Sequence, residues 1–250
     1  MSKPRTAVQL FSVRHEMAKD MPATLKAVRE MGYEGVEFYG GYIRPDLILK
    51  ALDDTGLKIA GWHTPIANLM PNLIEAAIVY NKLIGNNSLV VPALPVEYTA
   101  AREGWLKAAD ILQNAGKRLA EEGMYTGYHN HHTEFTPVEG DTPWDIMANA
   151  TDKSVALQID TGNCMRGGGD PLALMRKYPG RSRTVHLKPF SKKDEFVTMI
   201  SRDDTDWAAV KEICANETEW YIVEYECETL YKPLEGINLC LKALKELWNL

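Results

Sequence analysis

The chain has 250 residues, of which 45% are hydrophobic and 25% are charged, and its formal net charge is −6 at pH 7. This length suits one eight-stranded α/β barrel, and the composition is that of an ordinary globular protein. The acidic balance argues against a nucleic-acid partner, and the longest apolar runs are too short to cross a membrane. We therefore expect a small-molecule partner, with no nucleic acid and no membrane involved. The sequence leaves a homo-oligomer open.

The cysteine pattern bears on the compartment. Four cysteines are scattered along the chain without the CxxC spacing of metal fingers or redox motifs. Such cysteines are typical of reduced thiols in the cytosol, and the first six residues lack the apolar core of a signal peptide. We therefore expect a cytoplasmic protein.

Strand-like and helix-like segments alternate along the whole chain. The expected strands are residues 7–10, 35–38, 57–63, 88–91, 125–130, 155–160, 184–187 and 221–225. The expected helices are residues 22–31, 45–55, 71–84, 100–122, 142–150, 171–177, 207–215 and 235–247. This alternation predicts a parallel sheet with the helices outside it.

Prolines and glycines mark the ends of many of these helices. A proline in the first turn loses no hydrogen bond, and this is the expected position of Pro22, Pro45, Pro71, Pro143 and Pro171. A glycine after a helix allows a left-handed cap, which we expect at Gly32, Gly56, Gly85 and Gly123. Because eight strand–helix units close naturally and no linker interrupts them, we predict a single (β/α)₈ TIM barrel domain over residues 1–250.

The last four expected strands each end near a side chain that can bind a metal. These side chains are His129, Asp160, His186 and Glu224. In a closed parallel barrel the carboxyl ends of the strands converge on one mouth, so these residues should meet. A purely structural role would explain any one of them, but not four strands ending in this way. Two imidazoles and two carboxylates suit a divalent transition metal that holds an oxygen-rich substrate. We expect Mn²⁺ or Co²⁺ first, Zn²⁺ or Fe²⁺ as alternatives, and Mg²⁺ last.

The alternation of side chains along a strand adds further candidates to this mouth. Lys188 shares a strand face with His186, Glu226 shares one with Glu224, and His131 shares one with His129. Two residues earlier in the chain are open to either interpretation. His63 and Glu37 end their strands, where each can contact substrate or support another side chain.

An ordered set of short runs resembles a known family. The runs are QLFSVR (9–14), GYEGVE (32–37), YHNH (128–131) with EF (134–135), DTGN (160–163) with GDP (169–171), and HLK (186–188). In this order and over essentially the whole chain, they resemble the sugar phosphate isomerase/epimerase family of the xylose isomerase-like barrel superfamily. That superfamily includes tagatose-type epimerases, inosose dehydratases and enzymes that act on 3-keto-glycosides.

The resemblance implies a metal held by Glu, Asp, His and Glu from strands five to eight. Asp160, His186 and Glu224 match the last three, whereas strand five offers His129 where tagatose-type epimerases have a glutamate. Either His129 is the strand-five ligand or Glu134 folds back to replace it. We expect catalytic roles for Glu134, His131 and Glu224. We expect substrate contacts from His63, Asn163, Lys188, Glu37 and Glu226.

The resemblance therefore predicts a divalent-metal-dependent isomerase or epimerase, or a related lyase, acting on a keto or polyhydroxy sugar through an enediolate. A 3-keto-glycoside lyase or hydrolase and an inosose-type dehydratase are alternatives that use the same site. Two alternatives belong to other classes. An endonuclease on abasic DNA would need more ligand histidines and a basic groove, which a net charge of −6 disfavours. A non-catalytic sugar-binding barrel would not need an intact ligand set.

Overall fold

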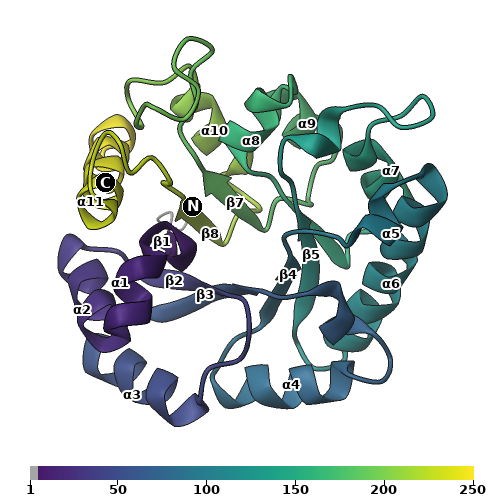
Figure 1. The fold of residues 1–250 in the computed structure, drawn as a ribbon, viewed down its shortest axis with the longest axis horizontal. Helices are drawn as coiled ribbons and strands as arrows, with labels where there is room; N and C mark the ends of the chain where they lie inside the picture. Colours follow the sequence, from purple (N-terminus) through teal and green to yellow (C-terminus); the bar gives the residue numbers. More distant parts are fainter. Residues whose placement is uncertain (1–4) are drawn as a thin grey trace.

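A computed structural model describes residues 5–250, in which eight parallel strands form one sheet in the order β6-β5-β4-β3-β2-β1-β8-β7. A bridge between Asp160 and His186 joins the two edges, so the sheet is a nearly closed barrel (Figure 1). The predicted TIM barrel fold is confirmed. The strands are β1 (Thr6–Gln9), β2 (Gly35–Tyr39), β3 (Lys58–His63), β4 (Ser88–Val91), β5 (Tyr125–His129), β6 (Val155–Gln158), β7 (Thr184–Leu187) and β8 (Trp220–Val223).

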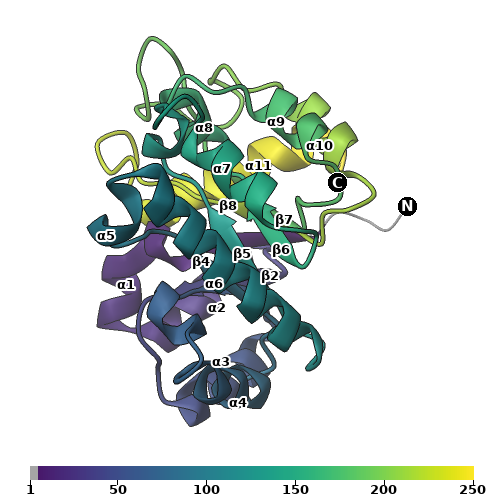
Figure 2. The same cartoon turned by 90° about the vertical axis from the view of Figure 1, so that its right-hand side faces the viewer.

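Helices surround the strands, with α3 and α4 on one side of the barrel and α8, α9 and α10 on the opposite side (Figures 1 and 2). The α-helices are α1 (Arg14–Lys19), α2 (Met21–Met31), α3 (Pro45–Thr55), α4 (Ile74–Leu83), α5 (Val96–Thr99), α6 (Arg102–Ala120), α7 (Pro143–Ala150), α8 (Thr161–Arg166), α9 (Pro171–Lys177), α10 (Trp207–Cys214) and α11 (Pro233–Trp248). Three 3₁₀ turns follow strands: η1 (Leu10–Val13), η2 (Ile66–Leu69) and η3 (Thr133–Phe135).

The expected helix ends are confirmed at most places. All four cap glycines have positive φ, from 71° to 99°. The expectation for Pro71 is wrong, because α4 begins at Ile74 and Pro71 lies in the turn before it. The short helices α1, α5 and α8 were not predicted, since four to six residues are too few to show a helical period.

Residues 5–250 form two apolar cores. The larger one lies between the outer face of the sheet and the helices, where strand residues such as Val36, Trp62 and Leu157 are buried. The smaller one lies at the amino-terminal end of the barrel interior and contains Ala7, Ala60, Trp220 and Ile222. Above this small core the interior is filled by polar side chains, which must bond to one another because water is excluded.

A register shift between β2 and β3 makes room for one of these polar side chains. Val36 pairs with Ile59 but Glu37 pairs with Gly61, so Ala60 is an extra residue in β3. A Cβ atom on Gly61 would lie 2.8 Å from Oε1 of Glu37. Glycine at position 61 therefore leaves the space that the Glu37 carboxylate occupies.

The described residues also bear on the membrane and cysteine expectations. Within residues 5–250 no helix is both long and apolar enough to span a membrane. Cys164, Cys214, Cys227 and Cys240 are all buried and free, as expected of reduced thiols. A cytoplasmic location stays a prediction.

Arg181 reinforces the seam between β6 and β7. Its side chain is buried and donates to the backbone oxygens of Val155 (2.8 Å), Thr151 (3.0 Å) and Ala148 (3.2 Å), and to the Thr151 hydroxyl (2.7 Å). Its own backbone oxygen accepts from the Leu157 N–H at 2.8 Å. Side chain and backbone of one residue thus tie the two strands together at the end of the barrel away from the predicted mouth.

We predict that Arg181→Met lowers the free energy of unfolding by about 3 kcal/mol, because it leaves several buried carbonyl oxygens without a donor. Urea unfolding followed by circular dichroism measures the change. Arg176→Met, on the exposed face of α9, is the matched control and should change stability by less than about 0.5 kcal/mol. Equal losses in the two variants would contradict the role of Arg181.

Candidate metal centre and substrate cavity

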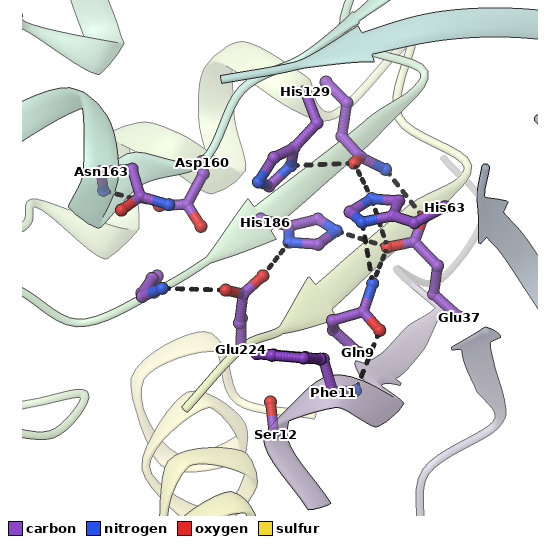
Figure 3. Close-up of polar contacts among 12 residues, drawn as sticks. Gln9, Phe11, Ser12, Glu37, His63, His129, Asp160, Asn163, His186 and Glu224 are labelled. Carbon is purple, nitrogen blue, oxygen red and sulfur yellow. Dashed lines mark hydrogen bonds and ion pairs between the residues drawn. The ribbon is translucent and has the colours of Figure 1, made fainter. Parts of the chain in front are cut away.

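Four side chains from the last four strands meet at the carboxyl-end mouth of the barrel. His129 ends β5, Asp160 follows β6, His186 lies in β7, and Glu224 follows β8. All four are buried, and one candidate ligand atom from each lies within 4.8 Å of those of the others. Figure 3 shows these side chains pointing toward one another. The convergence expected from the strand ends is present, and the cluster can hold a metal ion.

Asp160 has one oxygen committed to the fold and one free. Its Oδ1 accepts from the Asn163 N–H at 2.7 Å and so caps the first turn of α8. Its Oδ2 is buried and has no hydrogen-bond partner within the described chain. Burial raises the pKa of this carboxyl to about 7, although the nearby Lys188 opposes the rise. A buried, unpartnered carboxylate oxygen is the kind of atom that a bound cation satisfies.

His186 lies between two carboxylates. Its Nδ1 is 2.6 Å from Oε2 of Glu224, and its Nε2 is 2.6 Å from Oε2 of Glu37 (Figure 3). Burial would lower the pKa of this imidazole, but the two carboxylates outweigh it and raise the pKa to about 10. Positive charge is therefore favoured here, and a divalent ion can supply it in place of the Nδ1 proton.

His129 has the opposite protonation preference. Burial holds its pKa well below the usual range, and the neighbouring His186 and His63 lower it further. Its Nδ1 is 3.0 Å from Oε1 of Gln158. A neutral imidazole that donates from Nδ1 presents the lone pair of Nε2, which is the form that binds metals. The donor set of two imidazoles and two carboxylates therefore fits a divalent transition metal.

Lys188 is a buried cation beside this cluster. Its Nζ donates to Oε1 of Glu224 at 2.8 Å and makes a short contact with Glu226. Burial alone would lower its pKa, but Glu224, Asp160 and Glu226 raise it above the usual range, so the ammonium stays charged. Lys188 thereby offsets part of the negative charge at the mouth.

A cavity of about 280 Å³ opens above the cluster. This volume is at the small end of the range for ligand sites and suits a single sugar ring better than an oligosaccharide. A larger hollow of about 770 Å³ lies near the amino-terminal end of β3 and contains none of the candidate residues. The smaller cavity is lined by Gln9, Phe11, Tyr39, Gly40, His63, Pro92, Ala93, His129, His131, Glu224 and Glu226.

Four of the eleven predicted site residues lie outside this cavity and the ligand cluster. Glu134 accepts from the Tyr128 hydroxyl of β5 (2.8 Å) and, within its own loop, from the His131 N–H (2.9 Å) and the Thr133 hydroxyl (3.0 Å). Asn163 is buried in the first turn of α8, with no partner for its Nδ2 in residues 5–250. The other two are Lys188 and Glu37, which lies beneath the cluster. The roles of all eleven residues stay predictions.

Sequence reasoning did not include Gln9 and Gln158 among the site residues. Gln158 contacts His129 and His63 through Oε1, and Gln9 donates to Glu37 at 2.7 Å. Both lie on inward-facing positions of their strands. An amide at an inward position of a barrel strand is a usable signal, because it must bond to another buried polar group.

Comparison with known proteins places the chain in a family. Residues 25–247 match the family model described as the xylose isomerase-like TIM barrel. An inosose dehydratase of Bacillus anthracis is 29% identical over 86% of this chain and 85% of its own length. A sugar phosphate isomerase/epimerase from Parabacteroides distasonis has a TM-score of 0.81 at 24% identity, covering 96% of this chain and 97% of that one. An L-ribulose 3-epimerase has a TM-score of 0.68 at 12% identity, covering 99% and 97%.

The chain belongs to the xylose isomerase-like TIM barrel family. It is an enzyme of the sugar isomerase/epimerase-like superfamily, since the inosose dehydratase that aligns along most of its length is an enzyme. The resemblance read from the short sequence runs is thereby confirmed.

We predict that Asp160→Asn empties the metal site and leaves the fold intact. Asparagine caps a helix as well as aspartate does, so α8 should keep its first turn while the ligand charge is lost. Metal content after dialysis against Mn²⁺ or Co²⁺ gives the result. Asp170→Asn, which changes the equivalent cap of α9, is the matched control and should keep one ion per chain. A loaded Asp160→Asn protein would contradict the assignment.

We also predict that His129, rather than Glu134, is the strand-five ligand. His129→Ala should lose the metal, because its ring belongs to the cluster. Glu134→Gln should keep the metal, because that carboxylate is bonded within its own loop. Metal analysis of the two purified variants decides between them. An empty Glu134→Gln site beside a loaded His129→Ala site would reverse the two roles.

Proposed function

We propose that this chain is a metal-dependent lyase that removes water from an uncharged keto-sugar or keto-cyclitol. The observation that carries the proposal is the buried cluster of two imidazoles and two carboxylates directly below a cavity of about 280 Å³. The inosose dehydratase relative, which aligns over 86% of the chain, supports dehydration as the outcome.

The charges around the cavity support an uncharged substrate. No lysine or arginine lines the cavity within the described part of the chain, whereas Glu224 and Glu226 do. The buried lysine beside the cavity, Lys188, is already paired with these two carboxylates. A phosphate group would meet negative charge without a free partner, so a phosphorylated sugar or a nucleic acid is disfavoured.

The reaction begins with proton removal from the carbon next to a carbonyl group. His129, Asp160, His186 and Glu224 would hold a divalent ion, which would supply Lewis acidity at the substrate carbonyl oxygen. His131 is suited to be the base, because it lines the cavity and burial lowers its pKa, so that its ring is neutral near pH 7. The carbon–oxygen bond at the next carbon then breaks. The protonated His131 returns its proton to the departing hydroxide, which leaves as water.

Epimerisation or isomerisation is the second candidate, because it starts with the same proton removal. Tagatose-type epimerases, which the sequence resembles, pair two metal-bound glutamates across the substrate carbon. Here His129 takes the place of one of them, so that Glu224 is the single glutamate of that pair. This difference favours elimination, in which the proton leaves and returns through one group on one side.

Mass spectrometry of the reaction separates the two candidates. The purified protein is loaded with Mn²⁺ or Co²⁺ and incubated with inosose and a set of keto-sugars in ²H₂O. We predict a product lighter by one water that disappears when the metal is chelated. His131→Asn should keep the metal and lower turnover by about 10²- to 10⁴-fold.

Other results would lead elsewhere. A product of unchanged mass carrying deuterium on carbon would establish epimerisation or isomerisation instead. Equal turnover by the loaded and the chelated protein would contradict a metal-dependent reaction. If no substrate is converted and none takes up deuterium, the result would favour a binding protein.

A further inference from the structure

Glu37 accepts hydrogen bonds from three side chains below the metal cluster and lies within ion-pair distance of a fourth, His63. Its carboxylate is completely buried. Oε2 accepts hydrogen bonds from Nε2 of Gln9 at 2.7 Å and from Nε2 of His186 at 2.6 Å. Nε2 of His63 lies 3.0 Å from the same oxygen. Oε1 receives Nε2 of Gln158 at 2.9 Å. Within the described chain, Glu37 is thus the shared acceptor of Gln9, Gln158 and His186, and the His63 ring lies beside it.

The carboxylate fixes the orientation of the Gln158 amide. A carboxylate only accepts, so the NH₂ group of Gln158 must face Glu37. The amide oxygen then faces the other way, 3.0 Å from Nδ1 of His129 and 2.8 Å from Nε2 of His63. Because this oxygen accepts, the proton of neutral His129 lies on Nδ1. The lone pair of its Nε2 is then free for a metal ion.

The same carboxylate fixes the proton on His186 directly. The Nε2–H of His186 donates to Glu37, so the nitrogen that can give up its proton is Nδ1, on the side of Glu224. Gly61 and the extra residue in β3 leave the space for this carboxylate. The backbone is therefore shaped around Glu37 as well as around the ligands.

We propose that Glu37 is a positioning residue that sets the metal-binding tautomers of both ligand histidines, directly for His186 and through Gln158 for His129. The inference rests on the metal site of the proposed function and adds to it the group that prepares the site. Carboxylates that orient ligand histidines in this way typically change metal affinity by about 10- to 100-fold when they are removed.

Exchanging Glu37 for glutamine disturbs this arrangement without changing its shape. The new amide can take two orientations. Its NH₂ group faces either the NH₂ group of Gln158 or the nitrogens of Gln9, His186 and His63. The first orientation brings fewer donors face to face. A 180° rotation of the Gln158 amide removes its contact between two NH₂ groups. That rotation places an NH₂ group against Nδ1 of His129, which moves the ring proton to Nε2 and blocks the lone pair. We expect Glu37→Gln to bind Mn²⁺ or Co²⁺ about 10- to 100-fold more weakly.

The chain offers a compensating exchange at Gln158. In the parent protein the Gln158 NH₂ group also donates to the Thr184 hydroxyl at 2.8 Å. In the double variant Glu37→Gln/Gln158→Glu, the new carboxylate accepts from His129, His63, the Thr184 hydroxyl and the new amide. The new amide oxygen accepts from Gln9 and His186. Every donor is satisfied again, so affinity should return to within about threefold of the parent protein. Gln158→Glu alone places two carboxylates face to face and should weaken binding by at least about 10-fold.

The single Gln158→Glu variant also separates tautomer control from simple charge. If Glu37 acted only by its negative charge, an added carboxylate next to the cluster would strengthen metal binding. Asp145→Asn, which removes a carboxylate that bonds Tyr178 and Lys177 outside the barrel, is the control for loss of net charge. It should bind metal as the parent does.

Isothermal titration of the metal-free proteins with Co²⁺, with circular dichroism to check folding, gives the affinities of the parent and the four variants. Imidazole ¹⁵N shifts of the metal-free proteins report the tautomers, with the His129 proton on Nδ1 in the parent and on Nε2 in Glu37→Gln. An unchanged affinity and tautomer in Glu37→Gln, or tighter binding by Gln158→Glu alone, would overturn the inference. If Glu37→Gln does not fold, the double variant decides alone, since full affinity supports the inference and lost affinity contradicts it.

Failure of this inference is distinct from failure of the proposed function. A parent protein that binds no metal contradicts the metal-dependent reaction itself. A parent that binds metal and dehydrates its substrate, with variants that bind equally well, contradicts only the role of Glu37.

Discussion

A buried carboxylate surrounded by side-chain nitrogens from four residues is the constraint on which the mouth of this barrel depends. Water cannot satisfy the side chains inside a closed sheet, so each polar group there needs a partner from another strand. Glu37 links residues of β1, β3, β6 and β7 through such contacts. The interior is therefore held by a hydrogen-bond pattern of fixed polarity, rather than by the aliphatic layers common in barrels of this kind. A pattern of this kind specifies side-chain orientation more tightly than apolar packing does.

Stability and chemistry are divided between the two ends of the barrel. At the amino-terminal end Trp220 and its small apolar neighbours fill the interior, and Arg181 bonds the edge strands from outside. At the carboxyl end the interior carries ionisable groups whose pKa values are moved in opposite directions, upward for His186 and downward for His129. Such opposed shifts arise because burial acts on both rings while carboxylates contact only one. The stable end allows the other end to hold groups that would be costly elsewhere.

The sequence predicted the barrel and the convergence of His129, Asp160, His186 and Glu224, because strand period, helix caps and strand ends are local signals. It did not predict which neighbours each buried group would meet. Glu37 remained open between substrate contact and support, since its partners come from strands far away in the chain. Helix α8 was not predicted, because its six residues come soon after a strand. Its N-cap residue, Asp160, was interpreted only as a metal ligand. The proline rule failed at Pro71, where the residue serves a turn instead of a helix.

Two of the four candidate metal ligands also close the sheet at the seam between β6 and β7. The bridge that completes the sheet joins Asp160 to His186, and both are members of the cluster. In the proposed function, an ion shared by these two residues would hold together the two edges that this bridge joins. Binding of the ion and closure of the sheet would then be linked equilibria. A ligand that binds only the closed form stabilises that form increasingly as its concentration rises. Opening of the sheet at this seam and release of the ion would then accompany each other.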